Sequence, residues 1–527
     1  MSKLQNSFFQ SCLIISSLLI LSACTLNNKT AADLPLPDLQ YTISIKDPST
    51  HCFHVELNFS GWMRDTVDLK MAKWMPGYYQ IMDYAKGVTS FSALDNKGKN
   101  LPVARPDSNT WRVSGIINMT FRVRYEIKAD RRFVANNYLD TTHAYFVPEA
   151  TFLYVKELIN KPVQIRIKVN SPWDKTATGL DSLPEKANEF TTSDFDMLFD
   201  CPILAGNLEE LPPFEIDGIK HRFIGYNLGS FNKIEFMAKL KEVVKEGVSI
   251  FGEIPYKQFT FIGIGPGYGG IEHLNNTTVS FNGNGLDKKE SMNSMMSYLA
   301  HEYFHNFNVK RIRPFELGPF DYEKENRTNL LWVSEGLSMY YEYLIVKRAG
   351  IINNKEFLSE LEGNINALEN DSGRYYQSLV QSSYNTWIDG PFGNPGKGAD
   401  KSISYYDKGA VTGLILDLSI RNATENDKSL DDLMRLLYNR YYKILQRGFT
   451  DAEFQQAAES VAGISLSREF EYVYTTREID YNNYLSFAGL GIAETKDGLN
   501  GKRRLSIIKL ENTSSIQDKI FKGLFGD

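Results

Sequence analysis

The chain has 527 residues, of which 42% are apolar and 23% charged, and this composition is typical of a globular protein with a large core. The length allows several domains. The formal net charge is −6 and there is no run of basic residues, which argues against a nucleic-acid-binding protein.

The N-terminal residues predict a lipoprotein signal peptide over 1–23. Lys3 precedes an apolar run at 12–21 that is too short for an ordinary membrane span. The sequence L-S-A-C at 21–24 resembles the bacterial lipobox, which implies cleavage before Cys24 and lipidation of its thiol. Residues 24–38 are then a polar tether, and we expect a lipid-anchored protein of the bacterial cell envelope, periplasmic or outer-membrane facing. The alternative is an uncleaved anchor or a plain signal peptide with an incidental cysteine.

Residues 39–215 predict an all-β domain. Apolar and polar residues alternate with a period of two at 39–45, 52–57, 121–127 and 164–169, and turn residues such as those at 95–98 separate these runs. A β-sandwich is the expected form. Cys52 and Cys201 could pair in an oxidising compartment, although two buried free thiols are the simpler expectation.

Residues 216–480 predict an α+β domain. An amphipathic helix is expected at 231–251, a strand at 258–264, and a Gly-rich segment directly after it. Helices dominate from Asp287 onward. A strand region followed by helices is typical of an α+β fold.

The pentapeptide H-E-x-x-H at 301–305 predicts a zinc site. It lies in a segment, 291–312, whose apolar residues recur close to every 3.6 positions and which contains no Pro or Gly. On such a helix His301 and His305 share one face and can hold one Zn²⁺, while Glu302 can reach a water on the metal. The alternative is an amphipathic helix with two incidental histidines.

Glu335 is the best candidate for a third ligand. It lies thirty positions after His305 in a second helical segment, surrounded by Trp, Val and Leu. Burial of an unpaired carboxylate is costly, and a cation would offset that cost. The alternative is an ion pair with Arg311 or Arg313.

Taken together, these blocks resemble the glycyl aminopeptidase family of thermolysin-like (gluzincin) zinc peptidases. The resemblance is carried by 301–314 (HEYFHNFNVKRIRP) followed by 332–336 (WVSEG), by G-Y-G-G-I-E-H at 267–273, by Y-Y-D-K-G at 405–409, and by W-M-P-G-Y-Y at 74–79. These blocks occur in the family's order, and the resemblance extends from about residue 40 to the C-terminus.

The resemblance implies a thermolysin-like catalytic domain with one Zn²⁺ held by His301, His305 and Glu335. Glu302 would be the general base. Tyr406 of the Y-x-K-G block would donate a hydrogen bond to the oxyanion, with the adjacent Tyr405 as the alternative.

The Gly-rich block implies an aminopeptidase. Glu272 would pair with the free α-ammonium of a peptide, while Gly269 and Gly270 would let the substrate backbone come close. The family resemblance adds a preference for small first residues, Gly or Ala. His273 replaces the Asn of the related alanyl-type motif, and a positioning role fits it better than a ligand role.

Two other functions remain open, and the oligomeric state is not indicated. One is a zinc endopeptidase with the same centre, and the other is a non-catalytic surface lipoprotein that binds protein or glycan. Residues 481–527 resemble the start of a PDZ domain, which this family carries at its C-terminus, but they are too few for a complete one.

Overall fold

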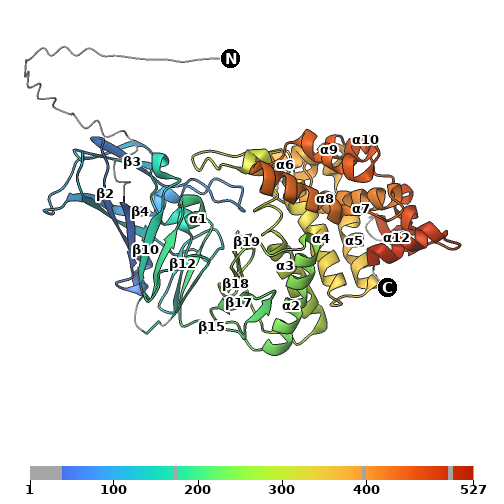
Figure 1. Cartoon of the computed structure of the whole chain (residues 1–527), viewed down its shortest axis with the longest axis horizontal. Coiled ribbons are helices and arrows are strands. Elements are labelled where there is room, and N and C mark those ends of the chain that lie inside the picture. The colour runs from blue at the N-terminus through green and yellow to red at the C-terminus, as the bar shows by residue number, and fades with distance from the viewer. Residues whose placement is uncertain (1–37, 170–171, 174, 394–398, 497–502, 526–527) are drawn as a thin grey trace, which may run out of the picture. The chain divides into compact units, whose positions relative to one another are not determined.

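The computed structural model describes residues 38–527, except 170–171, 174, 394–398, 497–502 and 526–527. The predicted signal peptide and the lipidation site at Cys24 therefore lie outside the described residues. Asp38–Asp527 form one compact unit, in which a β-rich N-terminal part precedes a mostly helical part, as predicted (Figure 1). In the described part, no helix is long and apolar enough to cross a bilayer.

Three sheets build the N-terminal β domain. The largest has the order β12-β13-β10-β1-β2-β7-β4, with strands β1 (Asp38–Ser44), β2 (Cys52–Ser60), β4 (Val88–Asp95), β7 (Phe121–Lys128), β10 (Val163–Lys168), β12 (Asp181–Ser182) and β13 (Glu189–Thr192). A second sheet contains β11 (Lys175–Thr178), β14 (Ile203–Gly206), β9 (His143–Phe146) and β8 (Tyr138–Leu139). A third contains β3 (Thr66–Lys70), β6 (Thr110–Ser114) and β5 (Val103–Asp107).

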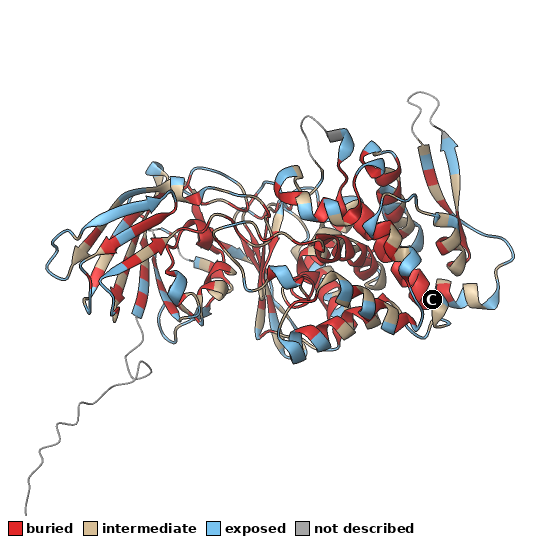
Figure 2. Cartoon of the chain, turned by 90° about the horizontal axis from the view of Figure 1, so that it is seen from above, coloured by how far each residue is buried: buried red, intermediate tan, exposed pale blue. Residues whose placement is uncertain are grey.

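Period-two alternation determines which side of these strands is buried. In β7 the odd-numbered residues are buried and the even-numbered ones are partly or fully exposed, and β10 follows the same rule (Figure 2). Tyr41 of β1 lies opposite Leu57 of β2 and Ile165 of β10, so buried side chains meet in register. Cys52 and Cys201 are free thiols.

The second domain is built on a sheet with the order β15-β17-β18-β20-β19. Its strands are β15 (Glu209–Glu210), β17 (Ile219–Gly225), β18 (Gln258–Gly263), β20 (Asn276–Val279) and β19 (Gly270–Glu272), and β16 (Phe214–Ile216) also pairs with β17. This sheet begins before residue 216, the predicted domain boundary. β17, β18 and β20 are parallel, whereas β19 is an antiparallel edge strand.

Helices pack around this sheet and fill the rest of the domain. They are α2 (Lys233–Phe251), α3 (Lys289–Phe304), α4 (Leu337–Arg348), α5 (Asn354–Glu369), α6 (Leu379–Asp389), α7 (Tyr405–Ala423), α8 (Leu430–Leu437), α9 (Asp451–Ala462), α10 (Ser467–Tyr474) and α11 (Tyr481–Leu485). α7 is buried along most of its length and packs against α4, α5, α6 and α9. α2 begins at the Asn232 cap and ends at Gly252, whose φ of 76° suits glycine.

α3 ends earlier than the sequence predicts. The apolar pattern favours a helix through 312, but regular helix stops at Phe304 and turns follow. The side chain of Asn306 donates to the main-chain carbonyl of Tyr303, so it competes with the helical hydrogen bonds. The later apolar residues of the pattern are buried by the turns instead.

The C-terminal segment forms a two-stranded sheet and one helix. β21 (Leu490–Lys496) pairs antiparallel with β22 (Arg503–Lys509), and α12 (Ser515–Phe525) follows. The Asn366 amide of α5 bonds both the carbonyl and the N–H of Leu505, which ties β22 to the helical part. Two strands do not make a complete PDZ domain, so the PDZ-like character stays a prediction.

Candidate active site

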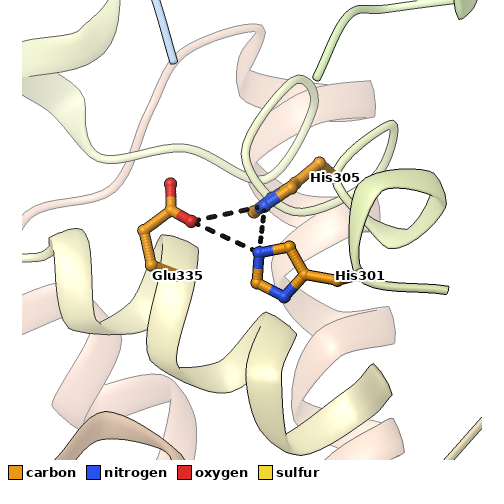
Figure 3. A group of neighbouring side chains, drawn as sticks. All are labelled: His301, His305 and Glu335. Atoms are coloured by element: carbon orange, nitrogen blue, oxygen red, sulfur yellow. Dashed lines mark hydrogen bonds and ion pairs between the residues drawn. The ribbon is translucent and has the colours of Figure 1, made fainter. Parts of the chain in front are cut away.

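Three predicted ligands converge from two helical segments. His301 lies in the last turn of α3, His305 caps its end, and Glu335 belongs to a π-helical turn, Trp332–Gly336, that leads into α4 (Figure 3). The Nε2 atoms of His301 and His305 are 3.0 Å apart. Oε2 of Glu335 lies 3.6 Å from the first nitrogen and 3.3 Å from the second.

These separations fit zinc. A tetrahedral Zn²⁺ with bonds of ~2.0–2.1 Å keeps its ligand atoms about 3.3 Å apart. The Glu335 side chain is only 3% exposed, and the three ligand atoms lie within 4.8 Å of one another. Arg311 does not neutralise Glu335, because its guanidinium donates to the carbonyls of Leu274, Asn306 and Pro255.

Two acceptors orient the imidazoles. Nδ1 of His301 lies 2.8 Å from Oε2 of Glu342 on α4, and Nδ1 of His305 lies 2.7 Å from the carbonyl of Asn308. The hydrogen bond of His305 Nδ1 and the ion-pair contact of His301 Nδ1 with Glu342 leave both Nε2 atoms facing the metal position. Burial lowers the pKa of His301, but the carboxylates of Glu335 and Glu342 outweigh it and raise the pKa well above its usual value.

Glycines bring the π-helical turn against α7. A Cβ on Gly336 would lie 2.5 Å from the Cα of Gly409, and one on Gly409 would lie 2.8 Å from the Cα of Gly336. Neither position can hold a side chain without moving the backbone. This contact places the start of α7, with Tyr405 and Tyr406, beside Glu335.

The two adjacent tyrosines have different surroundings. Tyr405 is buried and its hydroxyl bonds Thr386 Oγ1 at 3.2 Å. The Tyr406 ring stacks near His301, with centroids 6.1 Å apart. Burial and the Glu335 carboxylate raise the pKa of Tyr406, so its hydroxyl stays protonated. Of the two tyrosines, Tyr406 is therefore the one whose hydroxyl can donate a hydrogen bond beside the metal ligands.

Glu302 lines a cleft of about 590 Å³ that also contains His301 and Tyr406. Its side chain is buried, and Thr277 Oγ1 donates to its Oε2 at 3.4 Å. Burial raises the pKa of Glu302 to about 7, against the lowering effect of the neighbouring histidines. A carboxylate in this range can accept a proton near neutral pH.

The Gly-rich strand borders the same cleft. Gly269 and Gly270 line it, and a Cβ on Gly270 would overlap the Glu302 carboxylate, so only glycine fits there. Glu272 does not line this cleft. It lines a neighbouring cavity of about 270 Å³ that shares two wall residues with the cleft, Gly77 and Tyr79. Sequence reasoning did not assign these two residues to the site, although both lie in the 74–79 block.

Glu272 is buried but incompletely bonded. It is 4% exposed, and its Oε1 has no hydrogen-bond partner in the described part of the chain. A Cβ on Gly77, whose φ is +91°, would lie 2.8 Å from its Oε2. The β domain therefore packs directly on this carboxylate.

Comparisons with known proteins agree with this arrangement. The model of the Peptidase M61 N-terminal domain matches residues 40–207, and that of the M61 glycyl aminopeptidase matches 294–412. No curated protein matches the chain. An aminopeptidase N family protein from Idiomarina loihiensis is 27% identical with a TM-score of 0.81, over 87% of this chain and 79% of that one.

A second solved structure supports the fold alone. It is a mutant M1 zinc metallopeptidase from Deinococcus radiodurans bound to a Tyr-Ser-Ala substrate, 13% identical with a TM-score of 0.51, over 84% of this chain and 94% of that one. The two M61 models together match more than half of the chain, and the metal-ligand set lies inside the second. The chain therefore belongs to the M61 glycyl aminopeptidase family and is a zinc metallopeptidase.

Proposed function

We propose that this zinc peptidase is an aminopeptidase that removes small first residues, Gly or Ala, from peptides. The observation that carries the proposal is the buried carboxylate of Glu272, with one oxygen unpartnered among the described residues. An unpaired buried carboxylate is costly, and the free α-ammonium of a substrate would satisfy it. An endopeptidase needs no such group.

The strand that carries Glu272 also suits backbone capture. β19 lies at the edge of its sheet and, among the described strands, pairs only with β20, so its outer edge can receive an extended peptide as an added strand. Gly269 and Gly270 remove the side chains that would keep that peptide away from Glu302. Crowding by Gly77 and Tyr79 near Glu272 supports the preference for a small first residue.

The chemistry follows from groups with separate tasks. Zinc held by His301, His305 and Glu335 supplies Lewis-acid polarisation of the scissile carbonyl and a lowered pKa for water. Glu302 accepts the proton of the attacking water and passes it to the leaving amine. Tyr406 donates a hydrogen bond to the oxygen that becomes negative.

We further propose that the mature protein is anchored to a membrane of the bacterial cell envelope through lipid on Cys24, periplasmic or outer-membrane facing. Support comes from the L-S-A-C sequence at 21–24 and the apolar run before it. Stable anchoring needs more than one acyl chain, so several chains are expected on the processed cysteine.

A pair of peptides tests the aminopeptidase assignment. N-acetylation removes the charge that Glu272 would bind, and a charge-assisted contact contributes roughly 1.5–3 kcal/mol. We expect acetylation of a Gly- or Ala-initiated peptide to lower kcat/KM roughly tenfold to a hundredfold. Glu272→Ala should abolish most of this discrimination, whereas Glu290→Ala, an exposed carboxylate at the start of α3, should preserve it.

The alternatives make different predictions in the same assay. Equal cleavage of the free and acetylated peptides by the unaltered enzyme would replace this proposal with an endopeptidase. Stoichiometric zinc without hydrolysis of either peptide would favour the non-catalytic surface lipoprotein.

A further inference from the structure

Asp200 reaches from the β domain into the turn that follows β19. It directly follows the short helix α1 (Phe195–Phe199). Its Oδ1 accepts a hydrogen bond from Lys310 Nζ at 2.8 Å and lies 3.3 Å from Nδ1 of His273. Its Oδ2 accepts the main-chain N–H of Leu274. Asp200 thus contacts three residues of the catalytic domain through one carboxylate.

These partners flank the site on two sides. His273 and Leu274 directly follow Glu272, and Lys310 lies five residues after His305. β19 is only three residues long and lies at a sheet edge, so its ladder bonds alone hold it weakly. The Asp200 carboxylate therefore joins the end of the Glu272 strand to the segment that follows the zinc helix.

A second contact strengthens this junction at the far end of the turn. The main-chain carbonyl of Asp200 accepts Nδ2 of Asn276, the first residue of β20, at 3.1 Å. Both ends of the 273–276 turn are thus bonded to one residue of the other domain. Glu272 in turn pairs with Thr277 across β19 and β20.

Burial makes these hydrogen bonds strong and directional. The side chains of His273, Lys310 and Asp200 are 1%, 8% and 15% exposed. Burial raises the pKa of the Asp200 carboxyl, but Lys310 and His273 outweigh it and lower the pKa to about 2. Since a carboxylate only accepts, Nδ1 of His273 is the donor. Its Nε2 has no partner among the described residues, so Nδ1 provides the hydrogen bond that orients the ring.

We propose that Asp200 and His273 are positioning residues for capture of the substrate's free N-terminus, because they fix the end of β19 that carries Glu272. On the other side, Gly77 of the β domain packs against the Glu272 carboxylate. The β domain therefore takes part in substrate selection through two separate contacts. The inference rests on the proposed role of Glu272.

Three variants test the positioning role. His273→Leu removes the donor to Asp200, His273→Asn restores an N–H donor, and Asp200→Asn keeps the shape but removes the charge. A displacement of about 1 Å in a positioned group can lower rates about a hundredfold. We expect His273→Leu and Asp200→Asn to raise KM for free peptides and to lower the free-to-acetylated ratio of kcat/KM roughly tenfold. His273→Asn should keep most of that ratio.

The control breaks a different contact between the same domains. Lys70 Nζ of β3 lies 3.0 Å from Oε2 of Glu323, and neither residue lines the cavity that contains Glu272, so Glu323→Gln should leave the ratio unchanged. In a Glu272→Ala background, Asp200→Asn should lower the ratio no further. Zinc content and unfolding temperature are measured for every variant, and the two His273 variants decide the question if Asp200→Asn does not fold.

Two results would separate this inference from the proposed function. An unchanged ratio in Glu272→Ala would overturn the role of Glu272 itself. Asp200 and His273 have no positioning role if Glu272→Ala lowers the ratio while Asp200→Asn and His273→Leu leave it unchanged. The same conclusion follows if Asp200→Asn and His273→Leu impair cleavage of free and acetylated peptides equally.

Discussion

At the scale of single residues, the two tyrosines that open α7 offer a matched comparison. The Tyr406 hydroxyl faces Glu335, whereas the Tyr405 hydroxyl bonds Thr386. Loss of an oxyanion donor lowers kcat by about a hundredfold to a thousandfold. We expect this loss for Tyr406→Phe with zinc content retained, and only a few-fold change for Tyr405→Phe, both measured as kcat on a free Gly-peptide. Similar losses in the two variants would remove the oxyanion role from Tyr406.

Residues that act through local spacing could be predicted from the sequence, and those that act across the fold could not. His301 and His305 are one helical turn apart, so their common face follows from the helix alone. Glu342 lies seven residues after Glu335, which is about two helical turns further on. This spacing could have indicated that Glu342 lies on the same helix face as the third ligand. Tyr79 and Asp200 come from another domain, and no local pattern links them to the metal.

At the scale of elements, His221 of β17 connects the sheet to the zinc helix. Its Nε2 lies 2.8 Å from the Tyr256 hydroxyl, which in turn is 2.5 Å from the hydroxyl of Tyr303 on α3. Its Nδ1 donates to the Ile219 carbonyl at 3.0 Å. His221 is fully buried, and burial lowers its pKa to about 4.

This shift predicts a loss of stability in mild acid. The unfolded chain binds the proton near pH 6.5, but the folded chain binds it only near pH 4, so the neutral ring stabilises the fold above pH 6.5. As the pH falls from 6.5 to 4, this contribution, up to about 3 kcal/mol, is lost. We expect urea denaturation to show a falling free energy of unfolding over this window and a shallower fall in His221→Phe.

A second histidine provides the control for that measurement. His54 of β2 is partly exposed, so water already reaches its imidazole. We expect His54→Phe to change the slope less than His221→Phe. An equal slope in His221→Phe and the unaltered protein would show that His221 does not titrate in this window.

The boundaries and defects of elements were the part of the fold that the sequence predicted least well. The apolar period of 291–312 continues past Phe304, although side-chain amides end the helix there. The π-helical turn at Glu335 has the same apolar pattern as an ordinary helix. The turn lies in close contact with α7 through Gly336 and Gly409, and only the packed structure reveals this contact.

At the scale of the whole molecule, the sequence predicts a lipid anchor that would hold the peptidase at a membrane. Cys24 is the residue on which this depends. We expect Cys24→Ser to release the protein from the membrane fraction or to block its processing, as measured by fractionation and by the mass of the N-terminus. Purified protein should keep its activity, because the residues that line the cleft begin at Gly77. Unchanged membrane fractionation of Cys24→Ser would argue against lipidation.

The site is distributed widely along the chain, from Gly77 through Glu272 and Glu335 to Tyr406. During synthesis the chain emerges from its N-terminus, so the metal ligands are complete only after Glu335 and the oxyanion donor only after Tyr406. Because Gly336, beside Glu335, packs directly against Gly409 of α7, a chain that ends before α7 lacks both the oxyanion donor and the contact that supports the turn of the third ligand. The order of residues along the chain therefore completes the site only when nearly four-fifths of the protein has been made.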